Sequence, residues 1–535
     1  MNASLHGKTF ELIQWEYCSL IEYSDPFNEI ELDILITSPS NETWIIPTFW
    51  MGEQKWGARF IAKDAGVYQI STRCSDSTNK ILHNTKHQLH IKWGSHTPQA
   101  PNLKVSKNKL YLQDSKDKAF LWLADTWWMA LSKRLSYPND FTSLAQQRKM
   151  QEFNVILLVA GLFPDMDSFD ERGSNKAGFP WEKEYARINP HYFDEADKRI
   201  SYLINEGFVL CVLGSWGYYL QHMGEDKMKQ HWRYIIARWG AYSIVWCIAG
   251  EATMPYYLSK QRTEDMYTLH EGWTRLAHYI KTIEPFGNLL TIHPTEIGRD
   301  QIQEPSLLDF NLIQSGHNDY SSVQNTIKLV KHELHREPVM PTIIGETNYE
   351  GILHNSPSSI QRLSFWTAIL SGAKGYSYGA NGVWQVNTKE KPFGDSPHGD
   401  SWGDVPWEES YLYEGATQLG YAKQFLENYP WWLLEPHQEW ISPQGNLFDY
   451  KHPRVAGISA KLRIIYFYTS SYHWWNHPKY TLVNLENDII YESFFWNPQT
   501  NIKHSLGHIT STPKGHWKIP KLPSQEDWIL LLQSI

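Results

Sequence analysis

The sequence predicts a mixed α/β fold, in which a (β/α)₈ TIM barrel lies between an N-terminal and a C-terminal β-sandwich. Over residues 105–432 short apolar runs alternate with helical stretches, as in βα units of a parallel sheet. The two terminal segments, residues 1–95 and 436–535, carry short runs in which apolar and polar residues alternate. Such alternation is typical of half-buried strands and predicts the two β-sandwiches.

In the first segment, the alternation of apolar and polar residues is clearest at residues 11–20 and 30–37. Turn residues separate the runs, as expected for a small sandwich. A proline-rich stretch, residues 95–102, is the predicted linker to the barrel. In the last segment the clearest strands are residues 462–468 and 528–532.

The middle segment contains eight candidate strands, at residues 120–124, 153–160, 208–214, 243–249, 289–293, 310–315, 339–345 and 375–379. Amphipathic stretches between them, such as 193–206, 228–239 and 267–283, predict the helices. Eight strands over this length fit a TIM barrel with insertions. A doubly wound sheet would need a glycine-rich phosphate-binding turn after an early strand, and the sequence has none.

The composition favours a carbohydrate partner over nucleic acid or membrane. A net charge of −9 gives an anionic partner no electrostatic support. No segment reaches the roughly 18 apolar residues of a membrane span. The 26 Trp and 30 Tyr offer flat apolar faces with polar edges, which suit sugar rings. Core packing is the alternative for many of these rings.

The four cysteines make neither a disulfide framework nor a metal site. Cys211 and Cys247 lie in apolar runs and are predicted core residues. Cys18 and Cys74 could pair within the first domain, but nothing in the sequence requires it. We expect no metal and no cofactor, since no close histidine spacing of metalloprotease type occurs.

The first residues lack the basic-then-apolar pattern of a secretory signal. The expected location is cytoplasmic, or periplasmic or secreted if a signal has been removed.

Two glutamates follow predicted barrel strands, Glu251 after the fourth and Glu346 after the seventh. TIM-barrel active sites lie at the carboxyl ends of the strands. Glycosidic cleavage needs two carboxyl groups, and a separation of about 5–5.5 Å gives retention of configuration. We therefore predict a catalytic pair with retaining geometry. The alternative is that each is an ordinary solvated strand-end residue.

Other strand ends supply candidate substrate contacts. Asp125 and Trp127 follow strand one, where an aspartate can accept hydrogen bonds from sugar hydroxyls; a helix N-cap by Asp125 is the alternative. Trp216 after strand three and Trp384 after strand eight are candidate stacking platforms, with core packing as the alternative.

His293 and His317 end strands five and six, and each can donate a hydrogen bond to a carboxylate or hydroxyl. Tyr349, three residues after Glu346, either hydrogen-bonds that carboxylate or only packs. Tyr378 at strand eight is a further candidate substrate contact. The long loop 161–190 is large enough to shape specificity.

Seven short sequence motifs at the barrel strands, taken in order, resemble those of the apiosidase-like glycoside hydrolases. Their barrel lies between an N-terminal sandwich and a C-terminal sandwich once labelled a collagen-binding domain. The motifs are FLWLADTWW at 120–128, RKMQEFNVI at 148–156, GSWG at 214–217, VWCIAGE at 245–251, QSGH at 314–317, PTIIGETNYEG at 341–351 and GYSYGA at 375–380. The two terminal segments resemble the family's sandwiches as well.

The resemblance implies that Glu251 is the general acid/base and Glu346 the nucleophile. It implies a retaining hydrolase of a plant- or microbe-derived oligosaccharide or polysaccharide side chain, without cofactor. Gly250 departs from the wider clan, in which an asparagine that contacts the sugar 2-hydroxyl usually precedes the acid/base. The alternatives are a non-catalytic carbohydrate-binding protein, a glycosidase with inverting chemistry, or a transglycosylase. A lyase would need a cluster of Arg or Lys at the barrel mouth.

Overall fold

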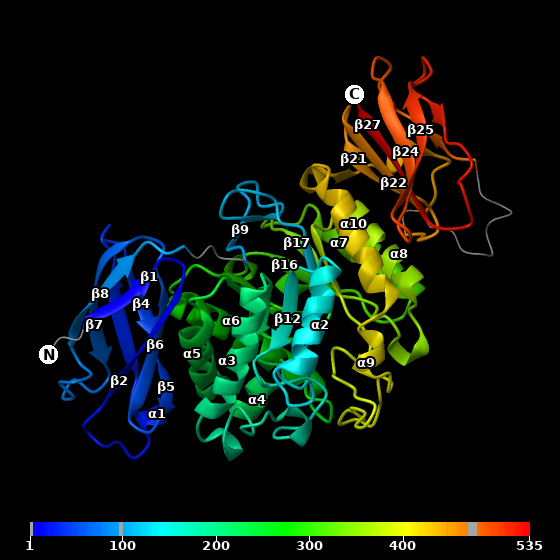
Figure 1. Ribbon diagram of the computed structural model, residues 1–535. Helices are drawn as coiled ribbons and strands as arrows, with labels where there is room; N and C mark the ends of the chain where they lie inside the picture. Colours follow the sequence, from blue (N-terminus) through cyan, green and yellow to red (C-terminus); the bar gives the residue numbers. More distant parts are fainter. Residues whose placement is uncertain (1–3, 96–99, 447, 469–478) are drawn as a thin grey trace.

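The computed structural model describes residues 4–95, 100–446, 448–468 and 479–535. A central barrel lies between two β-domains, with the N-terminal domain on one side and the C-terminal domain at the far corner (Figure 1). Part of the predicted linker, residues 96–99, lies outside the described residues.

The barrel sheet contains eight parallel strands in the order β15-β14-β13-β12-β11-β18-β17-β16. The predicted α/β fold with a TIM-like barrel and two flanking β-domains is thus confirmed. The strands are β11 (Trp122–Thr126), β12 (Val155–Val159), β13 (Val209–Leu213), β14 (Ile244–Cys247), β15 (Leu289–Thr291), β16 (Asn311–Gln314), β17 (Thr342–Glu346) and β18 (Gly375–Tyr378). Most are buried along their whole length, because a parallel sheet is covered on both faces.

The barrel is nearly closed between its two end strands, β15 and β16. The Thr291 hydroxyl donates to the carbonyl of Phe310 at 2.9 Å. The backbone N–H of Asp309 donates to the carbonyl of Leu290 at 2.8 Å. These bonds hold the ends of β15 and β16 together at the gap in the sheet.

Helices surround the sheet, and the three amphipathic stretches are confirmed as α3, α5 and α6, each beginning earlier than expected. The helices are α2 (Asn139–Met150), α3 (Pro190–Asn205), α4 (Tyr219–Met223), α5 (Glu225–Trp239), α6 (Arg262–Ile283), α7 (Tyr320–Glu333), α8 (Ser358–Leu370), α9 (Trp407–Ser410) and α10 (Glu414–Glu427). Short 3₁₀ helices occur at Glu171–Gly173, Lys183–Tyr185, Gly298–Gln301, Pro305–Leu307, Ile352–His354, Trp431–Leu433 and Gln438–Trp440.

The N-terminal domain is a sandwich of two sheets in the orders β1-β8-β7-β3-β4 and β2-β6-β5. Its strands are β1 (Leu5–Lys8), β2 (Leu12–Cys18), β3 (Leu32–Thr37), β4 (Thr43–Pro47), β5 (Phe49–Gly52), β6 (Lys55–Ile61), β7 (Gly66–Cys74) and β8 (Lys86–Lys92), with α1 (Pro26–Glu29) between β2 and β3. Cys18 and Cys74 do not pair, and all four cysteines are free thiols. A hairpin of β9 (Leu103–Val105) and β10 (Leu112–Asp114) leads into the barrel.

This domain packs against α5 and α3 of the barrel. The Arg59 guanidinium pairs with Asp197 and donates to the carbonyl of Arg238 at 2.6 Å. Arg238 pairs with Asp197 as well, at 2.9 Å. The Tyr234 hydroxyl donates to the carbonyl of Trp50 at 3.0 Å. A half-buried carboxylate shared by two arginines makes this contact specific to one docking geometry.

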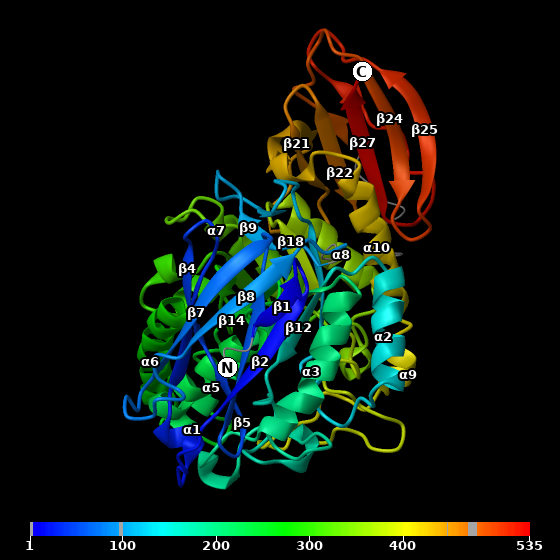
Figure 2. The ribbon, with the colours of Figure 1, turned by 60° about the vertical axis from the view of Figure 1, so that its left-hand side comes forward.

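The C-terminal domain also has two sheets, in the orders β19-β21-β22-β27-β24-β25 and β20-β23-β26. Its strands are β19 (Glu435–Pro436), β20 (Ile441–Ser442), β21 (Arg454–Ile458), β22 (Leu462–Phe467), β23 (Thr481–Leu482), β24 (Tyr491–Asn497), β25 (Ile502–Ile509), β26 (Trp517–Lys518) and β27 (Trp528–Ser534). The sheet stands over α8 and α10 (Figure 2).

Two features join this domain to the barrel. Arg362 on α8 donates from two nitrogens to Asp527, each at 2.7 Å, and both side chains are buried. Trp366 stacks on Tyr466, and Phe425 on α10 stacks on Trp496 with ring centroids 4.4 Å apart. Every residue of α8 from Ile360 to Leu370 is buried, because the C-terminal domain covers the face that usually meets solvent. In the described parts of the chain, no helix is long and apolar enough to cross a membrane.

Candidate active site

A cavity of about 410 Å³ opens at the carboxyl ends of the barrel strands, and both predicted catalytic glutamates line it. Residues at or after the ends of seven of the strands contribute to its wall, with β15 as the exception. The lining residues are Trp128, Pro164, Asp165, Trp216, Glu251, Met254, Tyr257, Arg262, Gln314, His317, Glu346, Tyr349, Ile352, Trp384, His398 and Trp402.

Glu251 stands in a strained turn just after β14. Its φ of 42° lies in the left-handed region, which non-glycine residues seldom adopt and which costs about 1–3 kcal/mol. The Met254 N–H donates to the Glu251 carbonyl at 2.7 Å, and the Ala252 N–H to the His293 carbonyl at 3.3 Å. These bonds hold the turn and direct the carboxylate into the cavity, where the Trp216 indole N–H donates to it at 3.3 Å.

The residue before it, Gly250, lies directly against Trp216. A Cβ at position 250 would come within 2.2 Å of the Trp216 ring. The backbone also pairs there, with the Gly217 N–H donating to the Gly250 carbonyl at 2.7 Å. Only glycine fits, so the indole occupies the space into which the asparagine side chain of the wider clan would project.

Glu346 is the last residue of β17 and is contacted by two histidines. His317 Nε2 lies 2.8 Å from one carboxylate oxygen in hydrogen-bond geometry. His293 Nε2 lies 3.2 Å from the other. Both histidines were predicted from the ends of strands five and six, and the barrel brings them to the same carboxylate.

Gln314 links the two glutamates. Its side-chain nitrogen donates to Glu251 Oε1 at 3.0 Å and lies 3.4 Å from Glu346 Oε1. The register of β16 shifts between Ile313 and Gln314, so that Gln314 pairs with Glu346 across the ladder. Bulges of this kind re-aim a side chain next to an active site. One amide therefore touches both carboxylates.

The two carboxyl groups have opposite electrostatic environments. Burial, together with the nearby charge of Glu346, raises the pKa of Glu251 to about 7. Burial also acts to raise the pKa of Glu346, but contacts from His293 and His317 outweigh it and lower that pKa to about 2. Near neutral pH, Glu346 is ionised while Glu251 retains a proton for part of the time.

Four other predicted contacts also line the cavity: Trp216, His317, Tyr349 and Trp384. Tyr349 receives a hydrogen bond from the Trp128 indole at 2.9 Å, and its ring packs on His317 with centroids 4.6 Å apart. His293 is fully buried beneath the cavity, where it contacts Glu346 and the Trp128 ring.

The structure does not bring Asp125, Trp127 and Tyr378 to the cavity. Asp125 is fully buried and paired with Arg148 at 2.6 Å, and it also accepts from the Trp127 indole at 2.7 Å. Tyr378 donates to Glu350 at 2.7 Å. These side chains form a polar network between the barrel and its helices, because Arg148 of α2 is buried there and needs carboxylate and carbonyl partners.

The cavity lies within the region that matches a known family. Residues 106–433 match the family described as "Apiosidase-like, catalytic domain". The chain belongs to this family. Residues 8–75 match a domain of unknown function, DUF5060. A search of curated protein sequences found no match.

Solved structures with the same fold include glycoside hydrolases. One named "Glycoside hydrolase" is 20% identical over 82% of this chain and 98% of its own, with a TM-score of 0.66. A family 5 glycoside hydrolase from Bacteroides vulgatus ATCC 8482 is 18% identical over 83% of this chain and 95% of its own, with a TM-score of 0.66. A structure named "putative glycoside hydrolase", from the same organism, covers 99% of this chain and 100% of its own at 14% identity and a TM-score of 0.67. The family match supports hydrolysis of glycosides.

Several lining residues were not predicted from the sequence, namely Trp128, Asp165, Tyr257, Gln314, His398 and Trp402. The sequence predicted that loop 161–190 shapes specificity, but it did not single out Pro164 or Asp165 within that loop. Trp128 stands next to the predicted Trp127, and the chain turn after β11 decides which indole faces the cavity. His398 and Trp402 come from a long loop after β18, where no periodic pattern indicates direction.

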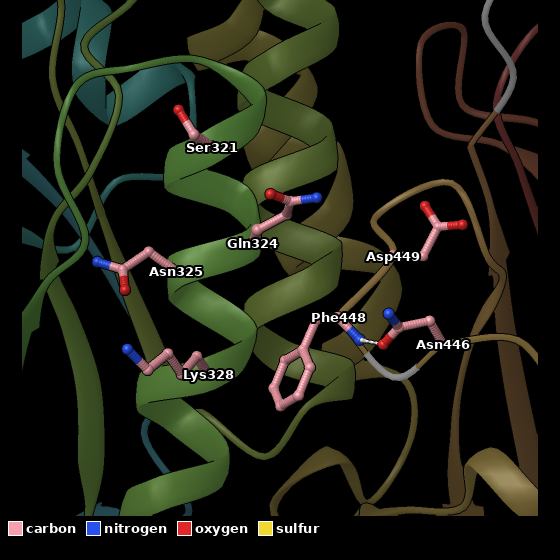
Figure 3. A pocket seen from close by; sticks show the side chains of 7 residues that line it. All are labelled: Ser321, Gln324, Asn325, Lys328, Asn446, Phe448 and Asp449. Atoms are coloured by element: carbon pink, nitrogen blue, oxygen red, sulfur yellow. Dashed lines mark hydrogen bonds between the residues drawn. The ribbon is translucent and has the colours of Figure 1, made fainter.

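A larger hollow, of about 620 Å³, lies elsewhere, between α7 and the loop that precedes β21. Figure 3 shows Ser321, Gln324, Asn325 and Lys328 along one helix face, with Phe448 pointing toward Lys328 and Asn446 and Asp449 across from them. It holds a single carboxylate and no pair. The cavity with Glu251 and Glu346 is therefore the better candidate for chemistry. Among the described residues, no three His, Cys, Asp or Glu side chains are grouped so as to hold a metal ion.

Proposed function

We propose that the protein is a retaining glycoside hydrolase with Glu251 as general acid/base and Glu346 as nucleophile. One observation carries this proposal: two carboxyl groups that share the Gln314 amide have pKa values shifted in opposite directions, to about 7 and about 2. Pairs of titratable groups whose environments separate their pKa values are typical of acid/base and nucleophile assignments.

In the first step, an oxygen of the Glu346 carboxylate attacks the anomeric carbon as the bond to the leaving oxygen breaks. Glu251 transfers its proton to that oxygen, and the aglycone departs as an alcohol. The glycosyl ester of Glu346 remains, and Glu251 is now a carboxylate. Burial is the main cause that raises the pKa of Glu251 and it persists, but loss of the negative charge on Glu346 removes the second cause, so Glu251 ionises more readily for the next step.

In the second step, Glu251 takes a proton from water while the water oxygen attacks the anomeric carbon. The bond to Glu346 breaks, the sugar leaves with its original configuration, and both carboxyl groups return to their starting states. His317 hydrogen-bonds to the Glu346 carboxylate that re-forms, and His293 lies 3.2 Å from its other oxygen.

The contacts of Gln314 support retention over inversion. One nitrogen lies 3.0 Å from an oxygen of Glu251 and 3.4 Å from an oxygen of Glu346. The two distances together are an upper limit for the separation of those oxygens. The two carboxyl groups therefore approach each other through these oxygens, as the closer spacing of retaining enzymes requires.

A non-catalytic sugar-binding protein is the second candidate, because the aromatic lining of Trp128, Trp216, Trp384 and Trp402 would serve binding alone. Binding alone gives no reason for a half-buried and a buried glutamate with divergent pKa values. A buried carboxyl group is costly, and the strained backbone of Glu251 adds to that cost.

The test is a screen of aryl glycosides, including pentofuranosides, with wild type, Glu251→Gln and Glu346→Gln. We expect both variants to lose at least about a thousandfold in kcat on the best substrate. Glu296→Gln is the matched control, because Glu296 is an exposed glutamate on the loop after β15. Wild-type turnover in either of the first two variants would refute the assignment.

Retention is tested separately. A 2-deoxy-2-fluoro glycoside of the cleaved sugar with a good leaving group should label Glu346, which peptide mass spectrometry locates. NMR of the first-formed sugar should show the anomeric configuration of the substrate. If the first product had the inverted configuration, Glu346 would act as a base that activates water and not as the nucleophile.

A further inference from the structure

A third carboxylate lines the cavity beside Glu251 and Glu346. It belongs to Asp165, on the loop after β12. Its side chain is 7% exposed and its φ is 56°, so it sits in a strained backbone conformation like that of Glu251. The negative charge of Asp165 is among the influences that raise the pKa of Glu251, which places it within electrostatic reach of the acid/base.

The hydrogen bonds of Asp165 leave part of its carboxylate free to accept more. The Tyr257 hydroxyl donates to Oδ1 at 2.9 Å, and the Ser396 hydroxyl donates to the same oxygen at 3.1 Å. The backbone N–H of Asp165 donates to the Tyr257 hydroxyl at 3.0 Å. A carboxylate offers about four acceptor positions over its two oxygens, and these two donors both reach Oδ1.

The partners come from three different strand-end loops. Asp165 follows β12, Tyr257 follows β14 and Ser396 follows β18. The ring of Tyr257 stacks on His398 at 5.2 Å and an interplanar angle of 7°. The group of Asp165, Tyr257, Ser396 and His398, here called the Asp165 cluster, therefore joins three loops along one wall of the cavity.

A carboxylate that is only structural is usually paired with a cation when it is buried. Asp125 is such a case, because Arg148 lies 2.6 Å from it. Among the described residues Asp165 forms no ion pair with Lys or Arg, and the hydroxyl groups of Tyr257 and Ser396 donate to it. Burial raises the pKa of Asp165, while these hydroxyls, the Trp402 indole and His398 act against that rise. Neutral hydroxyl groups are also what a sugar presents. The indole nitrogen of Trp384, on the same cavity, makes no hydrogen bond within the described chain and adds an unused donor.

We infer that Asp165 is a substrate-positioning residue whose carboxylate accepts hydrogen bonds from hydroxyl groups of the sugar that carries the scissile bond. The Asp165 cluster fixes the carboxylate, and its remaining acceptor capacity fits a hydroxyl-bearing sugar. The inference rests on the proposed function for the identity of the ligand as a sugar.

The test measures binding as well as turnover. Tryptophan fluorescence follows titration of wild type, Asp165→Asn and Tyr257→Phe with free pentoses and hexoses and their monodeoxy analogues. Asparagine keeps one oxygen for Tyr257 and Ser396 but loses the charge and the second acceptor. We expect Asp165→Asn to weaken the binding of the best sugar by about tenfold to a hundredfold, which is the effect of losing a hydrogen bond to a charged group.

One deoxy analogue should bind wild type and Asp165→Asn equally, because it lacks the hydroxyl that Asp165 holds. Tyr257→Phe should lower the affinity for the sugar and for all deoxy analogues by a similar factor. It removes a hydrogen bond that orients Asp165 but leaves the accepting carboxylate in place. Thermal unfolding of each variant checks that the fold is kept.

Equal weakening of the sugar and every deoxy analogue by Asp165→Asn, or none at all, would overturn the inference and leave Asp165 as a loop clamp. Absence of any sugar binding to wild type would overturn it as well. If wild type binds sugars with this pattern yet cleaves no aryl glycoside, the proposed function fails while the role of Asp165 stands.

Discussion

The indole of Trp216 lies against Gly250 so closely that a Cβ at position 250 would come within 2.2 Å of the ring. In the wider clan an asparagine usually stands at this position and contacts the sugar 2-hydroxyl. The backbone of residues 216–217 pairs with Gly250, so the ring is held there. The indole and an asparagine at this position exclude one another, and the Trp216 nitrogen donates to Glu251 alongside the Gln314 amide.

Restoring the asparagine is therefore expected to harm the enzyme. Gly250→Asn should displace Trp216, remove its hydrogen bond to Glu251 and lower kcat/KM by about tenfold or more, since a lost hydrogen bond to a charged group costs about 1.5–3 kcal/mol. Activity on the best aryl glycoside is the measurement. The double variant Gly250→Asn with Trp216→Ala relieves the clash. If the single variant is as active as wild type, Trp216 is free to move and does not position Glu251.

The pH dependence of kcat/KM should show a broad plateau with a decline on the alkaline side. The reaction needs Glu346 ionised, which holds above its pKa of about 2, and Glu251 protonated, which holds below its pKa of about 7. Half of the activity should be lost near pH 7, within about one unit. Glu251→Gln, assayed with a dinitrophenyl leaving group that needs no proton, should lack this alkaline decline. Persistence of the decline would assign it to another group.

Replacing His317 should move the acid side of the same profile. The contacts from His293 and His317 lower the pKa of Glu346, so His317→Ala raises that pKa, and kcat/KM should begin to fall at a higher pH than in wild type. His332→Ala is the control, because His332 is exposed and lies on the outer helix α7. An unchanged acid limb with reduced activity throughout would show that His317 contacts the sugar rather than tuning Glu346.

Asp125 should matter for stability and not for sugar binding. Asp125→Ala leaves Arg148 buried without its carboxylate, and loss of one partner of a buried ion pair costs about 3–5 kcal/mol. Thermal unfolding should show a clearly lower midpoint, and the KM of the remaining folded enzyme should equal that of wild type. The double variant Asp125→Ala with Arg148→Met should recover part of the loss. A large rise in KM without a change in the midpoint would return Asp125 to the substrate site.

The strand ends explain why the sequence predicted the catalytic pair. Glu251 and Glu346 each follow an apolar run of strand length, and a TIM barrel brings all such positions to one face. His293 and His317 were found in the same way. The rule fails one or two residues beyond the strand, where the chain turns. Asp125 lies within β11 and Trp127 directly follows it, yet neither lines the cavity, whereas Trp128 does.

The sequence by itself determined the order of the strands and helices, the three-part architecture and the two glutamates, because periodicity and strand ends are local properties of the chain. Only the tertiary structure decided what surrounds them. The bulge at Gln314 that joins the pair, the indole that requires Gly250 and the Asp165 cluster drawn from three loops depend on contacts between residues far apart in the chain. Those contacts also set the charges, since burial and neighbouring groups move the pKa of one glutamate up and of the other down.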